Sequence, residues 1–220
     1  MNEFKISISD EIYAVCPIFK FAAIQCKVKN NLHKDSLWQE INSFCSAYSA
    51  QNKIDDIKKR SAIFATREIY KKLGKDPNRY RPSAEALCRR IIRGLGLYQI
   101  DTVVDIINLV SLKTGYSIGG FDADKIVGNL VLGVGRPNEK FDAIGRGLLN
   151  IEGLPVYRDD IGGIGTPTSD EERTKITSET THLLMIINAY SGEAGLEEAV
   201  NCAEDLLKKY AYAEEFSIIY

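Results

Sequence analysis

Two segments of the chain combine closely spaced glycines with carboxylate and hydroxyl side chains. The first, GYSIGGFDAD at 115–124, contains Gly119, Gly120 and Asp122, and the second is RDDIGGIGTPTSDEERT at 158–174. Glycine lets backbone amides approach a ligand closely, and carboxylate or hydroxyl oxygens can orient a polar atom or a water molecule. Both segments are expected to form turns, and together they predict a pocket for a small molecule.

The second segment supplies most of the candidate site residues. Its composition points to seven polar or glycine positions: Asp160, Gly162, Gly163, Ser169, Asp170, Arg173 and Thr174. Because the same residue types are common in tight turns between strands, the alternative is that they only shape a turn. Asn108 lies within an apolar segment, where its amide either lines a pocket or ties down a neighbouring loop.

Other common catalytic signatures are absent from the sequence. It contains no GxxxxGK[ST] phosphate loop, no GxSxG and no HExxH, and its two histidines, His33 and His182, have no partner at ligand spacing. The five cysteines include no CxxC pair, which argues against a disulfide framework or a zinc site and predicts buried thiols. We therefore expect neither a metal nor a cofactor.

Basic residues form three clusters, KKRSA, KKLGKDPNRYR and RRIIR, with tyrosines between them. The last cluster places Arg89, Arg90 and Arg93 on one face of a predicted helix. Such a surface could follow a phosphate backbone, and solvated helix faces are the alternative. The formal net charge of -2 and the pI of about 5.8 provide no overall positive field, so an RNA contact requires a local patch.

The composition is that of a globular chain, with 45% hydrophobic and 26% charged residues among 220. The N-terminal sequence MNEFKISISDEIYAV lacks a basic stretch followed by a long apolar run. Nowhere does the chain approach the roughly 18 to 20 apolar residues that a membrane-spanning helix needs. We expect a cytoplasmic protein without a membrane partner.

Several segments repeat apolar residues at helical spacing and must position these candidate residues. One follows Ser36 and Gln39, which are spaced as a capping box, and another covers 55–73 and ends at Gly74. Further helices are expected from Ser83 to Gly94, at 102–113 with Thr102 and Asp105 at cap spacing and Gly115 behind it, and at 195–210. Because 102–113 is apolar on nearly every side, we expect it in the centre of the fold.

Short β-rich runs bounded by turn residues predict strands. They are FKISIS, FKFAAIQCKV, NLVLGVG, LPVYRDD, HLLMIIN and EEFSIIY. Since helical segments separate these runs, strands from distant parts of the chain must pair. The sequence therefore predicts an α+β fold, with 1–220 forming a single domain.

Taken in order, these segments resemble the tRNA-editing (B-three/B-four) domain of the phenylalanyl-tRNA synthetase beta subunit. The resemblance rests on VVDIINLV at 103–110, GYSIGGFDADKI at 115–126, the NEK segment around Glu139, and IGGIG followed by TSETTHLL. The synthetase domain reads VDITNYV, GQPLHAFD, a Gly-Glu pair and AGVMGG followed by a Thr-rich strand at these places. The likeness covers 80–190, and LGKDPNRYRPSAEALCRRI leads into it as in freestanding bacterial members of the family.

The resemblance implies a layered β/β/α fold with a pocket between the central helix and a sheet. Residues 1–80 then form an N-terminal α/β extension, and 191–220 add a C-terminal helix and strand. In the synthetase, the pocket hydrolyses the ester of tyrosine wrongly attached to the tRNA for phenylalanine, and freestanding members are expected to deacylate in trans. The implied partner is the acceptor end of an aminoacyl-tRNA, not DNA, and the oligomeric state stays open.

The family's motif matches this sequence at six positions: Asn108, Asp122, Gly162, Gly163, Thr180 and Thr181. Ester hydrolysis needs no metal when a pocket holds the 3' end, polarises the carbonyl and positions a water molecule. The amides of the two matched glycines would polarise the carbonyl. Asp122 or Asp160 would orient the water, and Asn108 with Thr181 would shape the amino-acid pocket.

The sequence departs from the family motif at two functional positions. The motif's histidine aligns with Gly119, and a glutamate of the strand after the Thr-rich segment falls near 185–188. A non-catalytic module of the same fold that binds RNA or a partner protein is the first alternative, and a pocket for a free amino acid or related small molecule is the second. Where RNA is bound, Arg89, Arg90 and Arg93 are expected to contact phosphates. The chain has no class II ATP-binding motifs, so aminoacylation is not expected.

Overall fold

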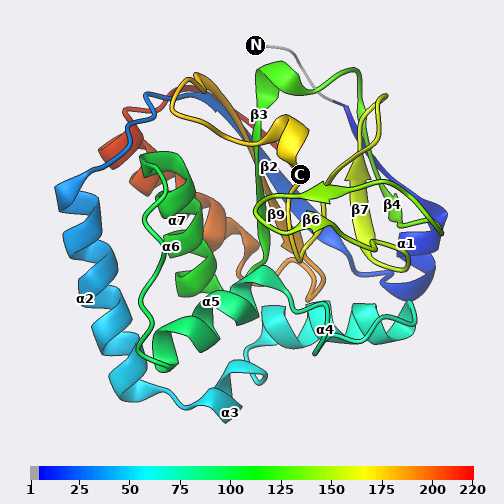
Figure 1. Ribbon diagram of the computed structural model, residues 1–220, viewed down its shortest axis with the longest axis horizontal. Helices are drawn as coiled ribbons and strands as arrows, with labels where there is room; N and C mark the ends of the chain where they lie inside the picture. The colour runs from blue at the N-terminus through cyan, green and yellow to red at the C-terminus, as the bar shows by residue number, and fades with distance from the viewer. Residues whose placement is uncertain (1–4) are drawn as a thin grey trace.

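A computed structural model describes residues 5–220 of the chain, and Figure 1 shows its arrangement. The strands in this range are β1 (Ile6–Ile8), β2 (Lys20–Lys27), β3 (Ile118–Asp122), β4 (Leu130–Val134), β5 (Asp142–Ala143), β6 (Gly147–Leu148), β7 (Pro155–Arg158), β8 (Gly163–Gly165), β9 (His182–Ala189) and β10 (Glu214–Ile219). The helices are α1 (Asp10–Val15), α2 (Asp35–Gln51), α3 (Ile54–Ile57), α4 (Ser61–Lys72), α5 (Ser83–Ile92), α6 (Thr102–Thr114) and α7 (Leu196–Ala211), with 3-10 turns η1 (Ala123–Lys125) and η2 (Glu172–Thr174). None of the helices in this range has the length and apolar content that a membrane crossing requires.

Two four-stranded sheets form the centre of the fold. The larger has the order β10-β2-β9-β3 with antiparallel pairing throughout, and the smaller has the order β1-β4-β7-β8. In the smaller sheet β1 runs parallel to β4, while the other pairs are antiparallel. Strands β2 and β9 pair over their full lengths although they come from opposite ends of the sequence. This confirms the predicted α+β class and its non-local strand pairing.

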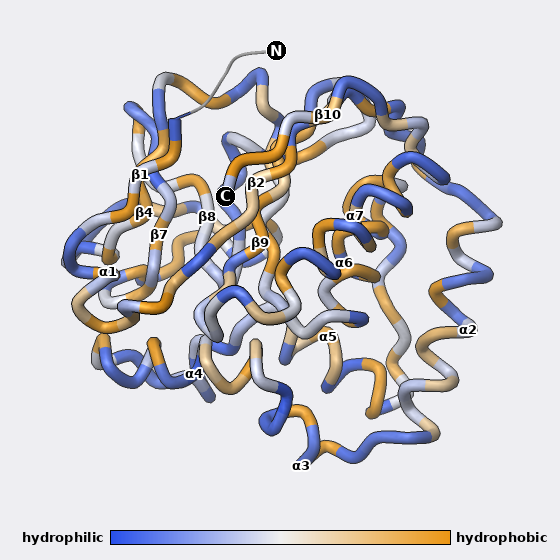
Figure 2. The backbone as a smooth tube through the Cα atoms, turned by 180° about the vertical axis from the view of Figure 1, so that it is seen from behind, coloured by the Kyte–Doolittle hydropathy of each residue, from blue (hydrophilic) through white to orange (hydrophobic). Residues whose placement is uncertain are grey.

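Both faces of the larger sheet are buried, because successive strand residues point to opposite faces. Ala22, Ile24 and Cys26 of β2 join the core that includes α6 and α7. Phe21 and Ala23 join a second core, shared with β4, β7 and β8 of the smaller sheet. Helices α6 and α7 and the smaller sheet therefore lie on opposite sides of the larger sheet (Figure 1), and Figure 2 shows hydrophobic residues along β9 between them. The expected layered β/β/α fold is confirmed.

Helix α6 lies in the centre of the fold, as predicted, but its N-terminal cap differs from the prediction. Asp101 is the cap, since its Oδ1 accepts a hydrogen bond from the backbone N of Val104 over 2.8 Å. Thr102 is the first residue inside the helix, and its hydroxyl is buried. At the other end Gly115 has a φ of 87°, a conformation that favours glycine, and ends the helix as predicted.

The helices before α5 also differ from the sequence prediction in detail. Helix α2 begins at Asp35, so Ser36 lies inside it and forms no capping box. The predicted helix at 55–73 is split into α3 and α4 around Arg60. The guanidinium of Arg60 donates to the carbonyls of Leu112 and Lys113 over 2.8 and 2.9 Å, at the end of α6. The break therefore places a cation on the carbonyls that α6 leaves unpaired.

Within the segment 115–124, predicted to be a turn, Ile118–Asp122 form the buried strand β3 instead. A Cβ at Gly120 would lie 2.4 Å from Cδ1 of Ile107 on α6, and one at Gly119 would lie 2.7 Å from Cζ of Phe121. Both distances are too short for a side chain. The two glycines are therefore explained by close packing of a strand, and the turn prediction was wrong because glycine clusters serve either purpose.

The five cysteines are free thiols, and three of them follow the prediction. Cys16, Cys26 and Cys88 are buried, and burial raises the pKa of Cys26 to about 12. Cys45 and Cys202 are only half-buried, so the prediction was wrong for these two. Each lies on a helix, α2 or α7, of which only one face packs against the core.

Candidate functional site

A cleft of about 490 Å³ opens beside α5 and α6. Helix α6 contributes Val104 and Asn108, and the segment 93–100 between α5 and α6 contributes four side chains. The turn between β5 and β6 and the loop between β8 and η2, which carries Asp170, complete the lining. Among the described residues that line the cleft, Asp170 is the one carboxylate. The cleft thus combines an apolar surface with a single acid.

The carboxyl group of Asp170 lies against glycines from two strands. The backbone N of Gly120 donates to Oδ2 of Asp170 over 3.1 Å, and a Cβ at Gly165 would lie 2.8 Å from Oδ1. Burial raises the pKa of Asp170 to about 7, and the hydrogen bond from Gly120 opposes this shift. A carboxyl group that is partly ionised at neutral pH is suited to accept and release a proton.

Five arginines line the same cleft and give it positive charge: Arg81, Arg89, Arg90, Arg93 and Arg146. Arg89 is held in place, since its Nε donates to Oε1 of the buried Glu85 over 2.8 Å. Arg93 and Arg146 are exposed to solvent. A cleft with this many guanidinium groups is suited to an anion such as phosphate, which they bind through several N–H donors.

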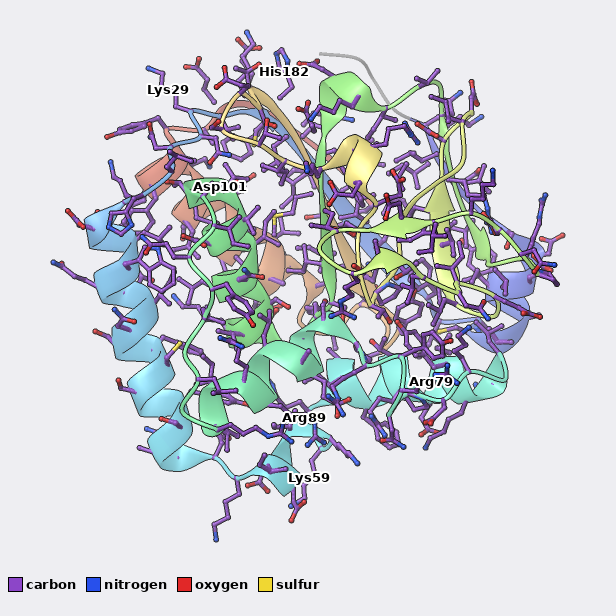
Figure 3. All side chains as sticks on the ribbon, viewed as in Figure 1. Lys29, Lys59, Arg79, Arg89, Asp101 and His182 are labelled. Carbon is purple, nitrogen blue, oxygen red and sulfur yellow. The ribbon has the colours of Figure 1, made fainter. Side chains whose placement is uncertain are left out.

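Figure 3 shows where the charged side chains lie along the molecule. Arg89 lies near Lys59 and on the same side as Arg79, whereas Lys29 and His182 lie at the opposite end. His182 pairs with Asp124 over 2.8 Å, away from the cleft, as expected for a structural histidine. The positive charge at the cleft is therefore a local patch on a chain whose net charge is -2.

The structure brings together part of the predicted site. Six of the predicted residues line the cleft: Asn108, Ser169, Asp170, Arg89, Arg90 and Arg93. Gly119 and Gly120 lie directly behind Asp170, where Gly120 donates to its carboxylate. Asn108 is half-buried on α6, which leaves its amide able to reach a ligand in the cleft. These residues form the candidate site.

Three residues that match the family motif, Asp122, Thr180 and Thr181, do not line the cleft. Asp122 ends β3 and accepts a hydrogen bond from the hydroxyl of Thr180 over 2.8 Å and from the backbone N of Asp124 over 3.2 Å. Thr181 is exposed, and its carbonyl accepts from the backbone N of Val28. These contacts tie β9 to β3 and β2. They give the three matched residues a structural role in the layered fold.

The glycines predicted to polarise the carbonyl also have other partners. The backbone N of Gly162 donates to Oδ1 of Asp159 over 3.0 Å, and Gly163 packs against Phe141 and Val156. Asp160 is exposed and its backbone N donates to the carbonyl of Val127. The segment DDIGG is therefore a turn stabilised by a carboxylate, which matches the alternative reading of its composition.

Arg173 and Thr174 belong to the same structural network. Two nitrogens of Arg173 donate to the two carboxylate oxygens of Asp159 over 3.0 and 2.9 Å, and this guanidinium holds the pKa of Asp159 below its ordinary value although burial opposes the shift. Thr174 is fully buried in η2. Neither residue lines the cleft, so their predicted role in the pocket has no support from their position.

Sequence reasoning missed several residues that line the cleft. Tyr98 and Ile100 come from the segment between α5 and α6, and Ile144 and Arg146 come from the turn between β5 and β6. All four are exposed, and neither segment carries a recognised motif or a periodic pattern. A usable signal was the pair of glycines in RGLGLYQI, because it stops a helix and leaves apolar residues in a short connection.

The contact between Gly165 and Asp170 gives a testable prediction for this loop. Gly165→Ala places a Cβ 2.5 Å from Cζ of Phe121 and 2.8 Å from Oδ1 of Asp170, and the resulting overpacking should lower the free energy of unfolding by about 1 to 3 kcal/mol. Gly162→Ala is the control, since nothing lies within 4 Å of its Cβ position. Urea denaturation measures both. Equal stability of the two variants would show that Asp170 does not lie against Gly165.

Within residues 5–220, no three histidine, cysteine, aspartate or glutamate side chains are grouped so that they could hold a metal ion. The chemistry available in the cleft is thus that of one carboxyl group, one amide, hydroxyl groups and several guanidinium groups. This set can bind an anionic ligand and move a proton.

Comparison with known proteins places the chain in a family. The B3/4 domain family matches residues 65–210. The phenylalanine-tRNA ligase beta subunit of Fusobacterium nucleatum is 30% identical over 106 residues, which cover 46% of this chain and 13% of that subunit. The corresponding subunit of Psychrobacter arcticus is 28% identical over 92 residues, covering 41% of this chain and 12% of the subunit. The chain therefore aligns with only a small part of these relatives.

A solved structure supports the same fold over nearly the whole chain. An N-terminal fragment of the phenylalanyl-tRNA synthetase beta subunit from Pyrococcus horikoshii superposes with a TM-score of 0.54 and 14% sequence identity. The superposition covers 99% of this chain and 50% of that fragment. At this identity the likeness concerns the fold alone. The match of the family over residues 65–210, more than half of the chain, establishes that the chain belongs to the B3/4 domain family.

Proposed function

We propose that the chain binds the acceptor end of an aminoacyl-tRNA in the arginine-lined cleft and hydrolyses the ester between the amino acid and the terminal ribose. The observation that carries the proposal is one partly ionised carboxyl group, Asp170, in a cleft lined by five arginines. The relatives are subunits of an enzyme named for its action on tRNA, which makes an RNA phosphate the natural anion. Acting on a separate tRNA, the chain would remove amino acids in trans.

The proposed reaction uses Asp170 as the general base. A water molecule held by the carboxylate attacks the ester carbonyl, and its proton passes to Asp170. The ribose oxygen then leaves with a proton, which Asp170 can return, so that the free amino acid and the RNA hydroxyl are released. The amide of Asn108 and a neighbouring guanidinium stabilise the negative charge that develops on the carbonyl oxygen. No metal is needed for this sequence of steps.

The position of Asp170 also bears on the histidine that this sequence lacks. A Cβ built at Gly119 would lie 3.5 Å from Oδ1 of Asp170, so a larger side chain there would meet the carboxyl group. Glycine at 119 therefore leaves room for Asp170 beside β3. This supports the proposal that a carboxylate from the β8–η2 loop does the work in this chain that other family members assign to a residue of β3.

The binding half of the proposal is tested by removing positive charge. Replacing Arg89, Arg90 and Arg93 with alanine should weaken binding of a tRNA acceptor-stem hairpin and lower the steepness of its salt dependence. Each phosphate contact contributes about 0.7 to 0.9 to the slope of log K against log salt, so losing three should reduce the slope by about 2. The control replaces three lysines outside the cleft, Lys27, Lys29 and Lys34, and fluorescence anisotropy over a salt series measures all three proteins. An unchanged slope in the arginine variant would contradict the assignment.

A non-catalytic RNA-binding module is the second candidate. The observation in its favour is that the motif's histidine and glutamate have no counterpart at Gly119 or at 185–188. In that case the hairpin binds with the salt dependence described above, but ester loss stays at the spontaneous rate. The two functions therefore differ in the deacylation assay and agree in the binding assay.

A further inference from the structure

We propose that the segment 93–100, between α5 and α6, is a stacking platform for an unpaired nucleobase at the 3' end of the bound RNA. The inference rests on the proposed function and adds a base-binding subsite to it. In Figure 1 this segment runs beside α6, from the end of α5 to the start of α6. Its side chains form one side of the cleft, next to the arginines.

The segment exposes apolar side chains to an unusual extent. Leu95, Tyr98 and Ile100 are 57%, 65% and 52% exposed, and all three line the cleft. Ile144, from the β5–β6 turn, lines the same cleft and is 40% exposed. Neighbouring exposed apolar side chains at the mouth of a cleft are typical of a binding surface, since a monomer gains nothing by leaving them in water.

An arginine already lies on the aromatic ring of this segment. The guanidinium carbon of Arg90 lies 3.7 Å from the centre of the Tyr98 ring, which is a cation–π contact. Tyr98 is nevertheless 65% exposed, so much of the ring surface that Arg90 does not cover faces the solvent. A second flat ring can stack on that surface, while nearby guanidinium groups pair with a phosphate.

The segment is held in shape at both ends. The backbone N of Leu95 donates to the carbonyl of Arg90 over 3.1 Å, and Nη2 of Arg90 donates back to the carbonyl of Leu95 over 3.2 Å. At the other end, the backbone N of Ile100 donates to Oδ1 of Asp105 over 3.1 Å. Oδ2 of Asp105 accepts from Nε1 of Trp38 over 2.7 Å, which fixes the carboxylate. A platform fixed in this way loses little conformational freedom when a ligand binds.

The combination of a ring, aliphatic side chains and arginines selects one class of occupant. Proteins bind single-stranded RNA by stacking unpaired bases on aromatic rings and guanidinium planes beside phosphate-binding cations. A paired base exposes its edges but not its faces, so the occupant is a base outside the helical stem. The acceptor end of tRNA ends in unpaired nucleotides, and the last of these carries the ester that Asp170 would face.

The test compares two acceptor-stem hairpins, one with an unpaired 3' extension and one cut back to the last base pair. Wild type should bind the extended hairpin more tightly than the blunt one. Tyr98→Ala should weaken binding of the extended hairpin about tenfold and leave binding of the blunt hairpin unchanged, because stacking on an aromatic ring is lost. Tyr98→Phe keeps the ring and should bind like wild type. Tyr13→Ala, which removes a tyrosine that is 44% exposed on α1, is the matched control.

The outcomes separate the subsite from the proposed function. If wild type and Tyr98→Ala bind the extended hairpin equally well, the stacking platform is overturned, while RNA binding itself still stands. A wild-type protein that binds neither hairpin would overturn the proposed function itself, and the platform with it. Equal loss for both hairpins in Tyr98→Ala would also contradict stacking, because the ring would then act on the stem or on the fold.

Discussion

Replacing Asp170 with asparagine should reduce ester hydrolysis about 100-fold or more and leave binding of the uncharged tRNA within twofold of wild type. Proton transfer by a positioned side chain contributes about 10² to 10⁴ to the rate of such reactions, and asparagine cannot accept the proton. Asparagine keeps an oxygen that can accept the hydrogen bond from Gly120, so the loop should keep its shape. Asp160→Asn, at an exposed position outside the cleft, is the control and should react at the wild-type rate.

Asp170→Asn should also change how the enzymatic rate of ester hydrolysis depends on pH. The general base works in its ionised form, and burial raises the pKa of Asp170 to about 7. The enzymatic rate of wild type, after subtraction of spontaneous ester hydrolysis, should therefore rise with pH up to about 7 and then level off. The rate of Asp170→Asn should show no inflection there. A wild-type profile that is flat between pH 5.5 and 8.5 would exclude Asp170 as the base.

Stability provides a readout that does not depend on activity. Because the pKa of Asp170 is higher in the folded state than in the unfolded chain, the folded state holds this proton more tightly. The contribution is favourable at low pH and is lost as pH rises through about 7, so ionised Asp170 destabilises the fold at pH 8. Asp170→Asn, which stays neutral, should be more stable than wild type at pH 8 and similar at pH 4. Urea unfolding at both pH values measures the difference.

Glu85→Gln should produce the largest loss of stability among single substitutions near the cleft. Glu85 is fully buried, and its carboxylate accepts from Nη1 of Arg67 over 2.7 Å and from Nε of Arg89 over 2.8 Å. Removing one partner of a buried ion pair leaves an uncompensated charge and typically costs about 3 to 5 kcal/mol. Since Arg67 is itself almost fully buried, its charge has no access to water as a substitute.

A surface ion pair supplies the control for Glu85. Glu68 pairs with Lys71 over 2.6 Å on α4, with both side chains more than a third exposed, and Glu68→Gln should cost less than about 1 kcal/mol. Thermal and urea unfolding compare the two variants with wild type. A Glu85 variant no less stable than the Glu68 variant would mean that the buried network does not hold α4 and α5 together.

Most elements of the fold follow from local patterns in the sequence. The strands β2 and β9 and the helices α5 and α6 carry enough apolar residues at the correct spacing to be recognised alone. The errors arose where one residue type serves two purposes. The sequence pattern predicts that Gly119 and Gly120 are turn residues, whereas close packing against Ile107 and Phe121 explains them. Such packing depends on the tertiary structure and leaves no periodic signal.

The candidate site was predictable only in part for the same reason. Asn108 and Asp170 were selected by residue type and do lie in one cleft. The same argument favours Asp160, yet it is exposed and outside the cleft, because it lies in the turn between β7 and β8 whereas Asp170 follows β8. Tyr98 and Arg146 lie on segments that are far apart in the sequence, yet both line the cleft. The composition of a loop therefore indicates which functional groups are available, and the topology of the fold decides which of them lie in the same site.

The measurement that tests the central claim most directly is the rate of ester loss from a panel of tRNAs, each charged separately with its correct or an incorrect amino acid. The purified protein is incubated with each, and the loss of aminoacyl ester is compared with the spontaneous rate and with that of Asp170→Asn. We predict rapid loss for at least one incorrect pairing, slow loss for the correct one, and no acceleration by the variant. Ester loss at the spontaneous rate for every pairing, with the acceptor-stem hairpin still bound, would contradict hydrolysis and leave an RNA-binding domain without catalytic activity.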